Sequence, residues 1–229
     1  MIGRLAALGA AAWIGWAWLP HLVTPACAWR GPRASRRLAL TFDDGPDPEW
    51  TPRLLDALGA VGVRATFFLI GERADRAPAL VRRMTAEGHE VGNHSWSHRC
   101  LWLCGPGATA AEIGRAHDRL ADLTGLAPRH FRPPWGMVNA AMFPALRRFG
   151  ERCVFWSIQP EGRRPVPAAR QVDHVLARVH PGAIVDLHDA EGTPAAPKRL
   201  LQALPALLQG VRAQGYALTT VADLLSARG

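Results

Sequence analysis

Residues 38–46 read Leu-Ala-Leu-Thr-Phe-Asp-Asp-Gly-Pro, a short apolar run that ends in two adjacent carboxylates and a Gly-Pro turn. The run at residues 38–41 predicts a buried strand. Two neighbouring carboxylates at a strand end repel each other, so this placement favours a nearby cation. The alternative is a plain Asp-Gly turn, which is common in proteins. The motif by itself leaves both interpretations open.

Short apolar runs alternate with longer amphipathic ones through the rest of the chain. The predicted strands are residues 38–41, 66–70, 90–93, 130–132, 153–157, 183–188 and 216–219. The predicted helices are residues 51–59, 78–87, 109–123, 139–149, 168–179 and 198–214, and residues 221–227 close the chain. This alternation favours an α/β fold with a parallel sheet, either open or closed into a barrel. Functional residues of such folds lie at the carboxyl ends of the strands.

The composition fits one folded domain with a short extension. The chain has 229 residues, 48% of them hydrophobic, so it is long and apolar enough to bury a core. The formal net charge is +8, almost entirely from arginine. Such a surface suits anionic lipid headgroups, sugar phosphates or acidic glycans. Nucleic acid is not an expected partner, because no zinc-finger spacing or aromatic–basic RNA-binding motif accompanies the charge.

The N-terminal 30 residues are expected to form a hydrophobic signal peptide or an uncleaved membrane anchor. Residues 5–29 carry no formal charge and are flanked by arginines on both sides. A small-x-small cleavage site is present at Ala26-Cys27-Ala28. Membrane association is therefore expected through residues 5–29, with the side of the membrane left open. The protein is expected to be anchored or secreted in the cell envelope, with its folded domain at residues 37–226.

The four cysteines are not expected to take part in chemistry. Cys100 and Cys104 could form a disulfide in an oxidising compartment or simply pack. None of the pairs, which also include Cys27 and Cys153, has the partners of a structural zinc site.

Two histidines follow the third predicted strand. His94 and His98 are four residues apart, a spacing that places both on one face of a helical turn and suits joint ligation of one ion. With one of the two aspartates they would supply two imidazoles and a carboxylate, leaving a position for water or substrate. Zinc at such a site lowers the pKa of bound water to about 7. A lone histidine is more often structural, but the pair favours a metal site.

Further polar residues follow the fourth and sixth predicted strands. The turn Arg132-Pro-Pro-Trp-Gly136 is rigid enough to hold a backbone N–H toward a developing oxyanion, and Arg132 could hold a carboxylate in place. The alternative is a stiff loop with an exposed arginine. The sixth strand ends in Ile-Val-Asp-Leu-His-Asp at residues 184–189, where His188 could act as a general acid.

From about Arg37 to Leu225 the chain resembles the NodB-homology polysaccharide deacetylases, a carbohydrate esterase family. The blocks Thr-Phe-Asp-Asp-Gly-Pro (41–46), His-Ser-x-x-His (94–98) and Arg-Pro-Pro-Trp-Gly (132–136) occur intact and in the family's order. Three ordered blocks at strand ends are far more specific than any one of them. The resemblance implies a single-domain, distorted (β/α)7 barrel, which agrees with the seven predicted strands.

The resemblance also implies a role for each matching residue. Asp43 would be the base that takes a proton from the metal-bound water, and Arg132 would orient it. The backbone N–H of Trp135 would stabilise the oxyanion, and His188 would protonate the leaving amine. Pro133, Trp135 and Leu187 are expected to line the substrate cleft. The implied metal ligands are Asp44, His94 and His98, with Zn²⁺ as the expected ion and Co²⁺, Ni²⁺ or Mn²⁺ as alternatives.

The sequence departs from the family pattern in two places. Family members carry an Asp-x-x-Asp-Trp-like block after the fifth strand, whereas residues 156–163 read Trp-Ser-Ile-Gln-Pro-Glu-Gly-Arg. Asp186 replaces an apolar residue that would line the acyl pocket. Asp186 shares a strand face with His188, so we expect it to orient and charge-balance that histidine and to make the pocket more polar. Glu161 is a rival for this role, and drift in a weakened enzyme is the simpler alternative.

The expected reaction is hydrolysis of an N-acyl group on an amino sugar of a glycan. An O-acetyl ester, a lipid-linked sugar and glycan binding without strong catalysis are the alternatives. Because the catalytic and ligand residues are all present, a purely binding role is disfavoured. A two-metal phosphoesterase is least expected, since it would need a second set of ligands.

Overall fold

One curled parallel sheet forms the centre of the molecule. The structure is a computed structural model in which residues 9, 11–34, 36–162 and 164–226 are described. Among these residues the sheet order is β5-β4-β3-β2-β1-β6, and β7 pairs with the first half of β1. The strands are β1 (Arg37–Asp43), β2 (Thr66–Leu69), β3 (Glu90–Asn93), β4 (His130–Phe131), β5 (Arg152–Cys153), β6 (Ile184–His188) and β7 (Ala217–Thr219).

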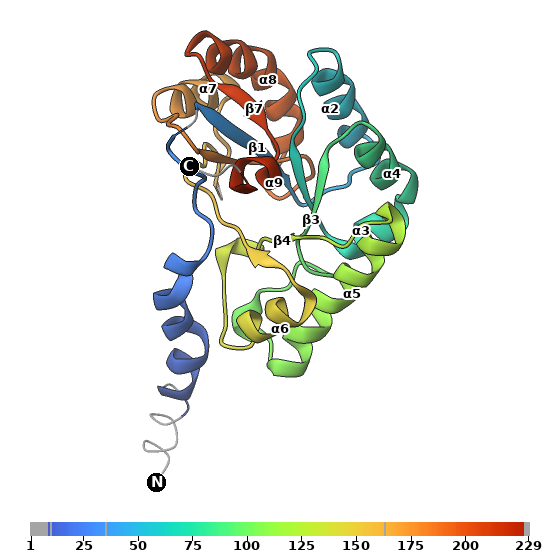
Figure 1. The fold of residues 1–229 in the computed structure, drawn as a ribbon, viewed down its shortest axis with the longest axis vertical. Coiled ribbons are helices and arrows are strands. Elements are labelled where there is room, and N and C mark those ends of the chain that lie inside the picture. Colours follow the sequence, from blue (N-terminus) through green and yellow to red (C-terminus); the bar gives the residue numbers. More distant parts are fainter. Residues whose placement is uncertain (1–8, 10, 35, 163, 227–229) are drawn as a thin grey trace.

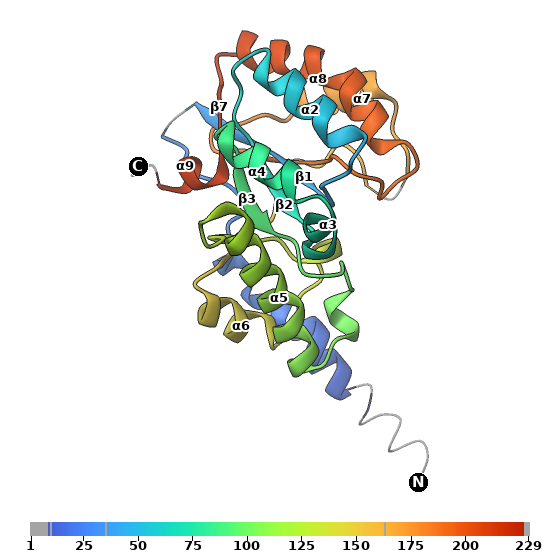
Figure 2. The ribbon, with the colours of Figure 1, turned by 90° about the vertical axis from the view of Figure 1, so that its right-hand side faces the viewer.

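Helices cover the outer face of the sheet in two groups. On one side α2, α7 and α8 lie together, and on the other α5 packs against α6 (Figures 1 and 2). The helices are α2 (Trp50–Gly59), α3 (Gly71–Arg76), α4 (Pro78–Ala86), α5 (Pro106–Thr124), α6 (Met142–Phe149), α7 (Ala168–Leu176), α8 (Ala196–Ala213) and α9 (Val221–Ser226). Shorter segments are η1 (Ile14–Trp18), η2 (Leu19–Ala26), η3 (Leu101–Leu103) and η4 (Pro134–Gly136).

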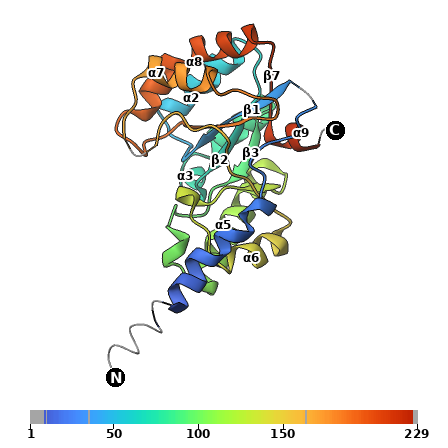
Figure 3. The same ribbon diagram turned by 90° about the vertical axis from the view of Figure 1, so that its left-hand side faces the viewer.

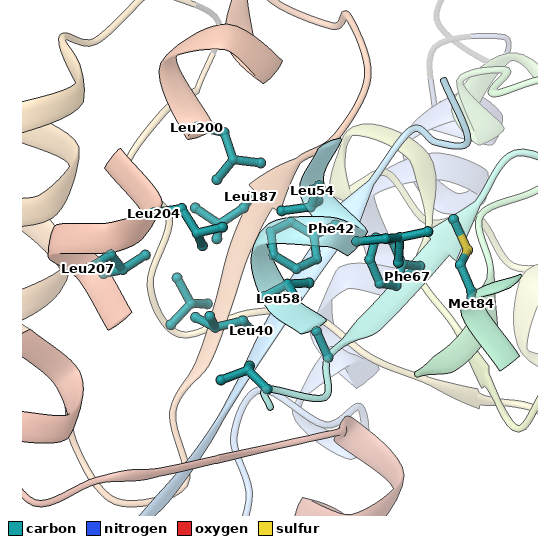
Figure 4. Close-up of a cluster of buried hydrophobic side chains, with 14 of the residues drawn as sticks. Leu40, Phe42, Leu54, Leu58, Phe67, Met84, Leu187, Leu200, Leu204 and Leu207 are labelled. Carbon is teal, nitrogen blue, oxygen red and sulfur yellow. The ribbon is translucent and has the colours of Figure 1, made fainter. Parts of the chain in front are cut away.

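The alternation along β1 explains how the sheet separates its core from its site. Leu40 and Phe42 face the helices and pack in the same fully buried cluster as Leu204 of α8 (Figure 4). Successive strand residues point to opposite faces, so Thr41 and Asp43 face the inside of the curl. Each buried Leu or Phe contributes roughly 1.5–3 kcal/mol by leaving water. The helix layer therefore stabilises the sheet while leaving its inner face free for polar groups.

The barrel is not closed by regular ladders. Between β5 and β6 the link is a single parallel bridge from Ile158 to Val185. Part of the gap is filled by the N-terminal segment: Ala28 bridges Val154, and Arg30 bridges Ala183. The expected α/β fold with seven parallel strands is confirmed, but its curl is that of a partly open barrel.

The N-terminal segment packs on the domain well before β1. Trp16 Nε1 donates to the Cys104 carbonyl (3.1 Å), and Ala140 N donates to the Trp16 carbonyl (3.1 Å). Figure 3 shows this helical segment running alongside α5 and α6. None of the helices in the described part of the chain is long and apolar enough to cross a bilayer. The signal peptide or membrane anchor expected at residues 1–30 stays a prediction. The C-terminal end of this segment pairs with the folded domain through Ala28 and Arg30.

Most predicted elements are found, with two informative differences. Helix α3 was not predicted, because its polar sequence Gly-Glu-Arg-Ala-Asp-Arg has too few apolar residues to show a helical period. The fifth strand was predicted over residues 153–157, whereas β5 ends at Cys153. Beyond that residue the backbone pairs with Ala28 instead: Phe155 N donates to the Ala28 carbonyl (2.8 Å).

Because the N-terminal segment packs against Gly182, we expect the stability of the fold to be unusually sensitive to substitution of this glycine. Gly182 has φ +79°, its carbonyl accepts from Gly31 N (2.7 Å), and a Cβ there would collide with the Gly31 carbonyl oxygen. Gly150 is the matched control, since its φ is +69° and a Cβ would meet nothing within 4 Å. We expect Gly150→Ala to cost about 1–2 kcal/mol for the left-handed backbone, and Gly182→Ala about 1–3 kcal/mol more for the collision. Urea unfolding measures both values, and equal losses would contradict the packing of residue 31 against residue 182.

Candidate active site

Three potential metal ligands meet at the carboxyl ends of β1 and β3. Asp44, His94 and His98 each offer one atom, and these atoms lie within 4.8 Å of one another. Asp44 Oδ1 is 3.5 Å from His94 Nε2 and 3.0 Å from His98 Nε2. Asp44 and His94 are buried, and His98 is partly exposed. The structure thus brings together the three residues predicted as ligands.

The two histidines do not lie on a helical turn, so that part of the prediction was wrong. Residues 94–98 form an irregular loop in which Ser95 (φ 66°) and His98 (φ 58°) adopt left-handed backbone conformations. Asn93 Oδ1 accepts from Ser95 N (2.9 Å), and Ser95 Oγ accepts from His98 N (3.1 Å). These side chains compete with helical hydrogen bonding, and they turn both rings toward Asp44.

Two buried glutamates hold this loop from behind, and the sequence analysis missed both. Glu112 of α5 accepts from Ser97 N (2.8 Å) and from Ser97 Oγ (2.7 Å). Glu151 accepts from Asn93 Nδ2 (2.9 Å) and pairs with His117 Nδ1 (2.6 Å). Burial raises the pKa of Glu151 even though His117 and Asn93 oppose the shift. The loop is thereby fixed to α5 and to the segment after α6.

The hydrogen bond to His94 Nδ1 prepares the other ring nitrogen for a metal. The Arg132 carbonyl is 2.7 Å from Nδ1 and can only accept, so Nδ1 carries the proton and the Nε2 lone pair faces Asp44. Asp44 Oδ1 is buried and has no well-aligned hydrogen-bond partner among the described residues. Burial raises the pKa of Asp44, but hydrogen bonds and positive charge from the His94 and His98 rings, when these are protonated in the absence of a metal, outweigh it and hold the pKa well below its ordinary value. An ionised oxygen without a donor, facing two imidazole nitrogens, fits a divalent cation.

Arg132 is buried and joins several strands at the centre of the site. Its Nη1 donates to Asp43 Oδ1 (2.7 Å) and to Thr41 Oγ1 (2.7 Å), and its Nη2 donates to the Phe155 carbonyl (3.1 Å). The guanidinium also lies over the Phe68 ring, 4.2 Å from its centroid. The alternative of an exposed arginine is excluded by its complete burial. The expected contact between Arg132 and Asp43 is present.

Asp186 lies on the same inner face but is held by other partners than expected. Its Oδ1 accepts from Arg132 Nη1 (3.2 Å) and its Oδ2 accepts from Gln159 Nε2 (2.9 Å). Burial, followed by the charge of Asp43, raises the pKa of Asp186 to about 7. Because both oxygens are engaged elsewhere, Asp186 does not orient the His188 ring by a hydrogen bond. The other part of the hypothesis, that the negative charge of Asp186 balances the positive charge of His188, remains compatible with these contacts.

His188 lines the cleft two residues further along β6. Burial lowers its pKa, but the charges of Asp186, Asp44 and Asp43 outweigh that effect, so the net shift is upward. The rival Glu161 is bound to Arg199 and accepts from Gln171 Nε2 (2.9 Å), so its carboxylate is directed away from this role. A histidine held toward its protonated form is suited to donate a proton.

The three potential ligands share one open cleft of about 370 Å³ with Asp43, Asp186 and His188. Pro133 and Trp135 line it as expected, and Trp135 is half-exposed with φ 60°. Backbone strain of this kind clusters at functional sites. The cleft is lined by Asp43, Asp44, His94, His98, Pro133, Trp135, Trp156, Gln159, Gly162, Asp186, His188, Gly192 and Thr193.

The expectation that Leu187 lines the substrate cleft was wrong. Leu187 is 4% exposed and packs in the core beneath α8, with Leu200 and Leu204 (Figure 4). Strand alternation explains this placement, because Leu187 points to the opposite face from its neighbours Asp186 and His188.

The structure adds three residues that the sequence analysis did not name as site residues. Trp156 and Gln159 line the cleft. Asp189 is buried, accepts from Thr51 Oγ1 (2.5 Å) and ties the first turn of α2 to the end of β6. Burial raises the pKa of Asp189 to about 7. The sequence offered one signal for Asp189, namely that it directly follows His188 at the end of a predicted strand.

Comparisons with known proteins agree with this geometry. The family profile described as polysaccharide deacetylase matches residues 30–154. The chain is 40% identical over 183 residues to a chitooligosaccharide deacetylase of Bradyrhizobium sp. (strain ANU 289), covering 80% of this chain and 83% of the relative. It is 36% identical over 192 residues to the peptidoglycan-N-acetylglucosamine deacetylase PgdA of Listeria monocytogenes, covering 84% of this chain but only 39% of that longer protein.

A solved structure shows the same fold. The crystal structure of the Bc1960 peptidoglycan N-acetylglucosamine deacetylase, in complex with 4-naphthalen-1-yl-N-oxidanyl-benzamide, superimposes with a TM-score of 0.80 at 32% identity. The alignment covers 89% of this chain and 94% of that chain. Because the sequence blocks, the inner-face constellation and these similarities coincide, the chain belongs to the polysaccharide deacetylase family.

Proposed function

We propose that this chain removes N-acetyl groups from amino sugars of a glycan by metal-dependent hydrolysis. The observation that carries the proposal is the placement of a base, an acid and three potential ligands around one cleft. Asp43 and His188 face the same space as the cluster of Asp44, His94 and His98.

The proposed metal site consists of Asp44 Oδ1, His94 Nε2 and His98 Nε2. Two imidazoles and one carboxylate form a ligand set that suits Zn²⁺, which we propose as the ion, and it also accommodates Co²⁺, Ni²⁺ or Mn²⁺. Such an ion polarises the substrate carbonyl and acidifies water. The His94 tautomer imposed by the Arg132 carbonyl supports this assignment.

Asp43 is the proposed general base. Arg132 occupies Asp43 Oδ1, so Oδ2 remains for accepting the proton of the attacking water. Oδ2 lies 3.7 Å from His94 Nε2, which places it at the edge of the ligand cluster. The fixed orientation of Asp43 reduces the entropic cost of reaching the reactive geometry.

His188 is the proposed general acid, and Trp135 the proposed oxyanion donor. His188 would give its proton to the amine nitrogen as the amide bond breaks. The N–H of Trp135 would stabilise charge on the carbonyl oxygen. The left-handed backbone of Trp135 (φ 60°) supports a positioned N–H. Asp186 acts on His188 through its charge.

The proposed substrate is an N-acetylglucosamine-containing glycan of the cell envelope. Support comes from the relatives, which are named as chitooligosaccharide and peptidoglycan deacetylases. Trp135 and Trp156 line the cleft, and aromatic faces suit sugar rings. Asp186 and Gln159 add polar groups to the inner end of the cleft. A membrane-bound or exported location would place the enzyme beside such a glycan.

Replacing Asp43 should reduce turnover strongly without removing the metal. We expect Asp43→Asn to lower kcat/KM by about 10²–10⁴, because an amide cannot take the proton. Acetate release from chitooligosaccharides, peptidoglycan fragments and acetylated xylan measures the loss, with EDTA treatment and Zn²⁺ or Co²⁺ restoration in parallel. Asp56→Asn is the control, since this carboxylate is 70% exposed on α2. EDTA-resistant release, or full activity of Asp43→Asn, would overturn the assignment; release from xylan alone would indicate an O-acetyl esterase.

The charge of Asp186 should set the alkaline limb of the pH profile. His188 must be protonated to act as an acid, and ionised Asp186 raises its pKa. Asp186 has a pKa of about 7, so its charge is present above that pH. Asp186→Asn should therefore lower the pKa of His188 and move the alkaline limb of kcat/KM to lower pH. Asp56→Asn, which removes an exposed carboxylate of α2 outside the cleft, is the control. An unchanged limb in Asp186→Asn would refute charge balance.

Glu112 should hold the ligand loop in its metal-binding conformation. Glu112→Ala removes both acceptors of Ser97, so we expect metal affinity to fall about 10-fold or more, as for other groups that support ligands. Glu112→Gln keeps one acceptor oxygen and should lose less. Competition with a chromogenic chelator measures the metal Kd, and the melting temperature of the metal-free protein separates loop positioning from global damage. Equal affinities in both variants and the parent would contradict the role.

A further inference from the structure

We propose that Cys27 and Cys153 are a disulfide-forming pair that fastens the N-terminal segment to the end of β5. The pairing differs from the Cys100–Cys104 disulfide, which the sequence left open as an alternative to simple packing of the two cysteines. It goes beyond the deacetylase activity, because it concerns how the chain before the domain is retained.

The backbone places the two cysteines next to each other. Ala28 and Val154 form a parallel bridge, in which Ala28 N donates to the Cys153 carbonyl (2.9 Å) and Phe155 N donates to the Ala28 carbonyl (2.8 Å). Cys27 and Cys153 each precede their bridge partner, so they are cross-strand neighbours. Adjacent strands lie about 4.8 Å apart, which is within the Cα separation of about 4.4–6.8 Å that disulfides require.

The two thiols meet in the same buried cluster. Cys27 is 6% exposed and Cys153 is 4% exposed, and both pack with Phe131 and Phe155. A hydrogen bond with the Cys153 thiol lowers the pKa of Cys27, and burial raises that of Cys153. Both are free thiols in this structure. By contrast, the Cys104 thiol is directed at the backbone carbonyl of Cys100 (3.6 Å).

Formation of the bond requires a disulfide oxidant, such as oxidised glutathione or a thiol–disulfide oxidoreductase. The Cys27 thiolate attacks one sulfur of the oxidant and releases the other as a thiol. The Cys153 thiolate then attacks the Cys27 sulfur, forming the internal bond and releasing the second thiol. Two protons and two electrons leave the protein, and the oxidant is reduced to two thiols.

The pair lies close to the active-site arginine. Trp29 stacks on Phe155 with ring centroids 4.2 Å apart, and the Phe155 carbonyl accepts from Arg132 Nη2 (3.1 Å). A bond between Cys27 and Cys153 would fix the segment that supports this carbonyl. It would also require Cys27 to remain in the mature chain, so cleavage after Ala28 and disulfide formation exclude each other.

The sequence allows an unambiguous peptide map. Trypsin places Cys27 in peptide 5–30 and Cys153 in peptide 153–163, whereas Cys100 and Cys104 share peptide 100–115. The full-length protein is equilibrated with glutathione buffers, alkylated and digested without reduction. We expect peptides 5–30 and 153–163 to appear linked, with the intact mass reduced by about 2 Da for two lost hydrogens. Four alkylated cysteines at every glutathione ratio, or a bond confined to peptide 100–115, would overturn the proposal.

Thermal unfolding gives a second, independent readout. A disulfide that closes this long loop should raise Tm by about 5–15 °C, an increase that reductant removes. Cys27→Ser should lose the reductant-dependent shift, and Cys100→Ser, the matched control, should retain it. A shift that persists in Cys27→Ser would assign the bond to other cysteines and reject the pair. The map of the unmodified protein decides the matter even if Cys27→Ser folds poorly.

Discussion

The buried guanidinium of Arg132 is the interaction on which the site depends. An arginine taken out of water is costly unless its charge is compensated, and here Asp43 and Asp186 both accept from Nη1. Its Nη2 reaches the Phe155 carbonyl, and its own carbonyl fixes the tautomer of His94. One residue therefore couples the proposed base, one proposed metal ligand and the segment beyond β5. Loss of its position would disturb all three together.

The charge around Arg132 explains why the site favours a cation. Three buried carboxylates line the cleft, those of Asp43, Asp44 and Asp186, and a fourth, Asp189, is buried directly after β6. Within the described part of the chain, Arg132 is the one arginine that is buried. Burial raises the pKa of Asp186 and of Asp189 to about 7, while the two imidazoles keep the Asp44 pKa well below its ordinary value. The excess negative charge is thus concentrated on the one carboxylate that faces both histidines. A divalent ion there would relieve the repulsion among the acids.

The sequence predicted the residues whose position follows from a strand end, and missed those that depend on distant contacts. Asp43, Arg132 and His188 were identified because parallel strands bring their carboxyl ends together. Glu112 and Gln159 could not be identified from the sequence, because each forms its hydrogen bond with a residue 15 or more positions away in the chain. The helical reading of His94 and His98 failed because a spacing of four also fits a loop with left-handed residues. The role of Ala28 in filling the barrel gap was missed because an apolar leader and an apolar packing segment have the same composition.

The two departures from the family pattern are physically one change. A carboxylate at position 186 is tolerable in a buried setting only if its oxygens find donors, and these are Arg132 on one side and Gln159 on the other. Gln159 in turn belongs to the segment where the family's Asp-x-x-Asp-Trp block is missing. Restoring an apolar residue at 186 alone would leave the Gln159 amide without its partner, and replacing Gln159 alone would leave one oxygen of Asp186 unsatisfied. The pair is therefore better understood as an alternative charge arrangement behind His188 than as decay, because drift at position 159 alone would have left one oxygen of the buried Asp186 without a donor.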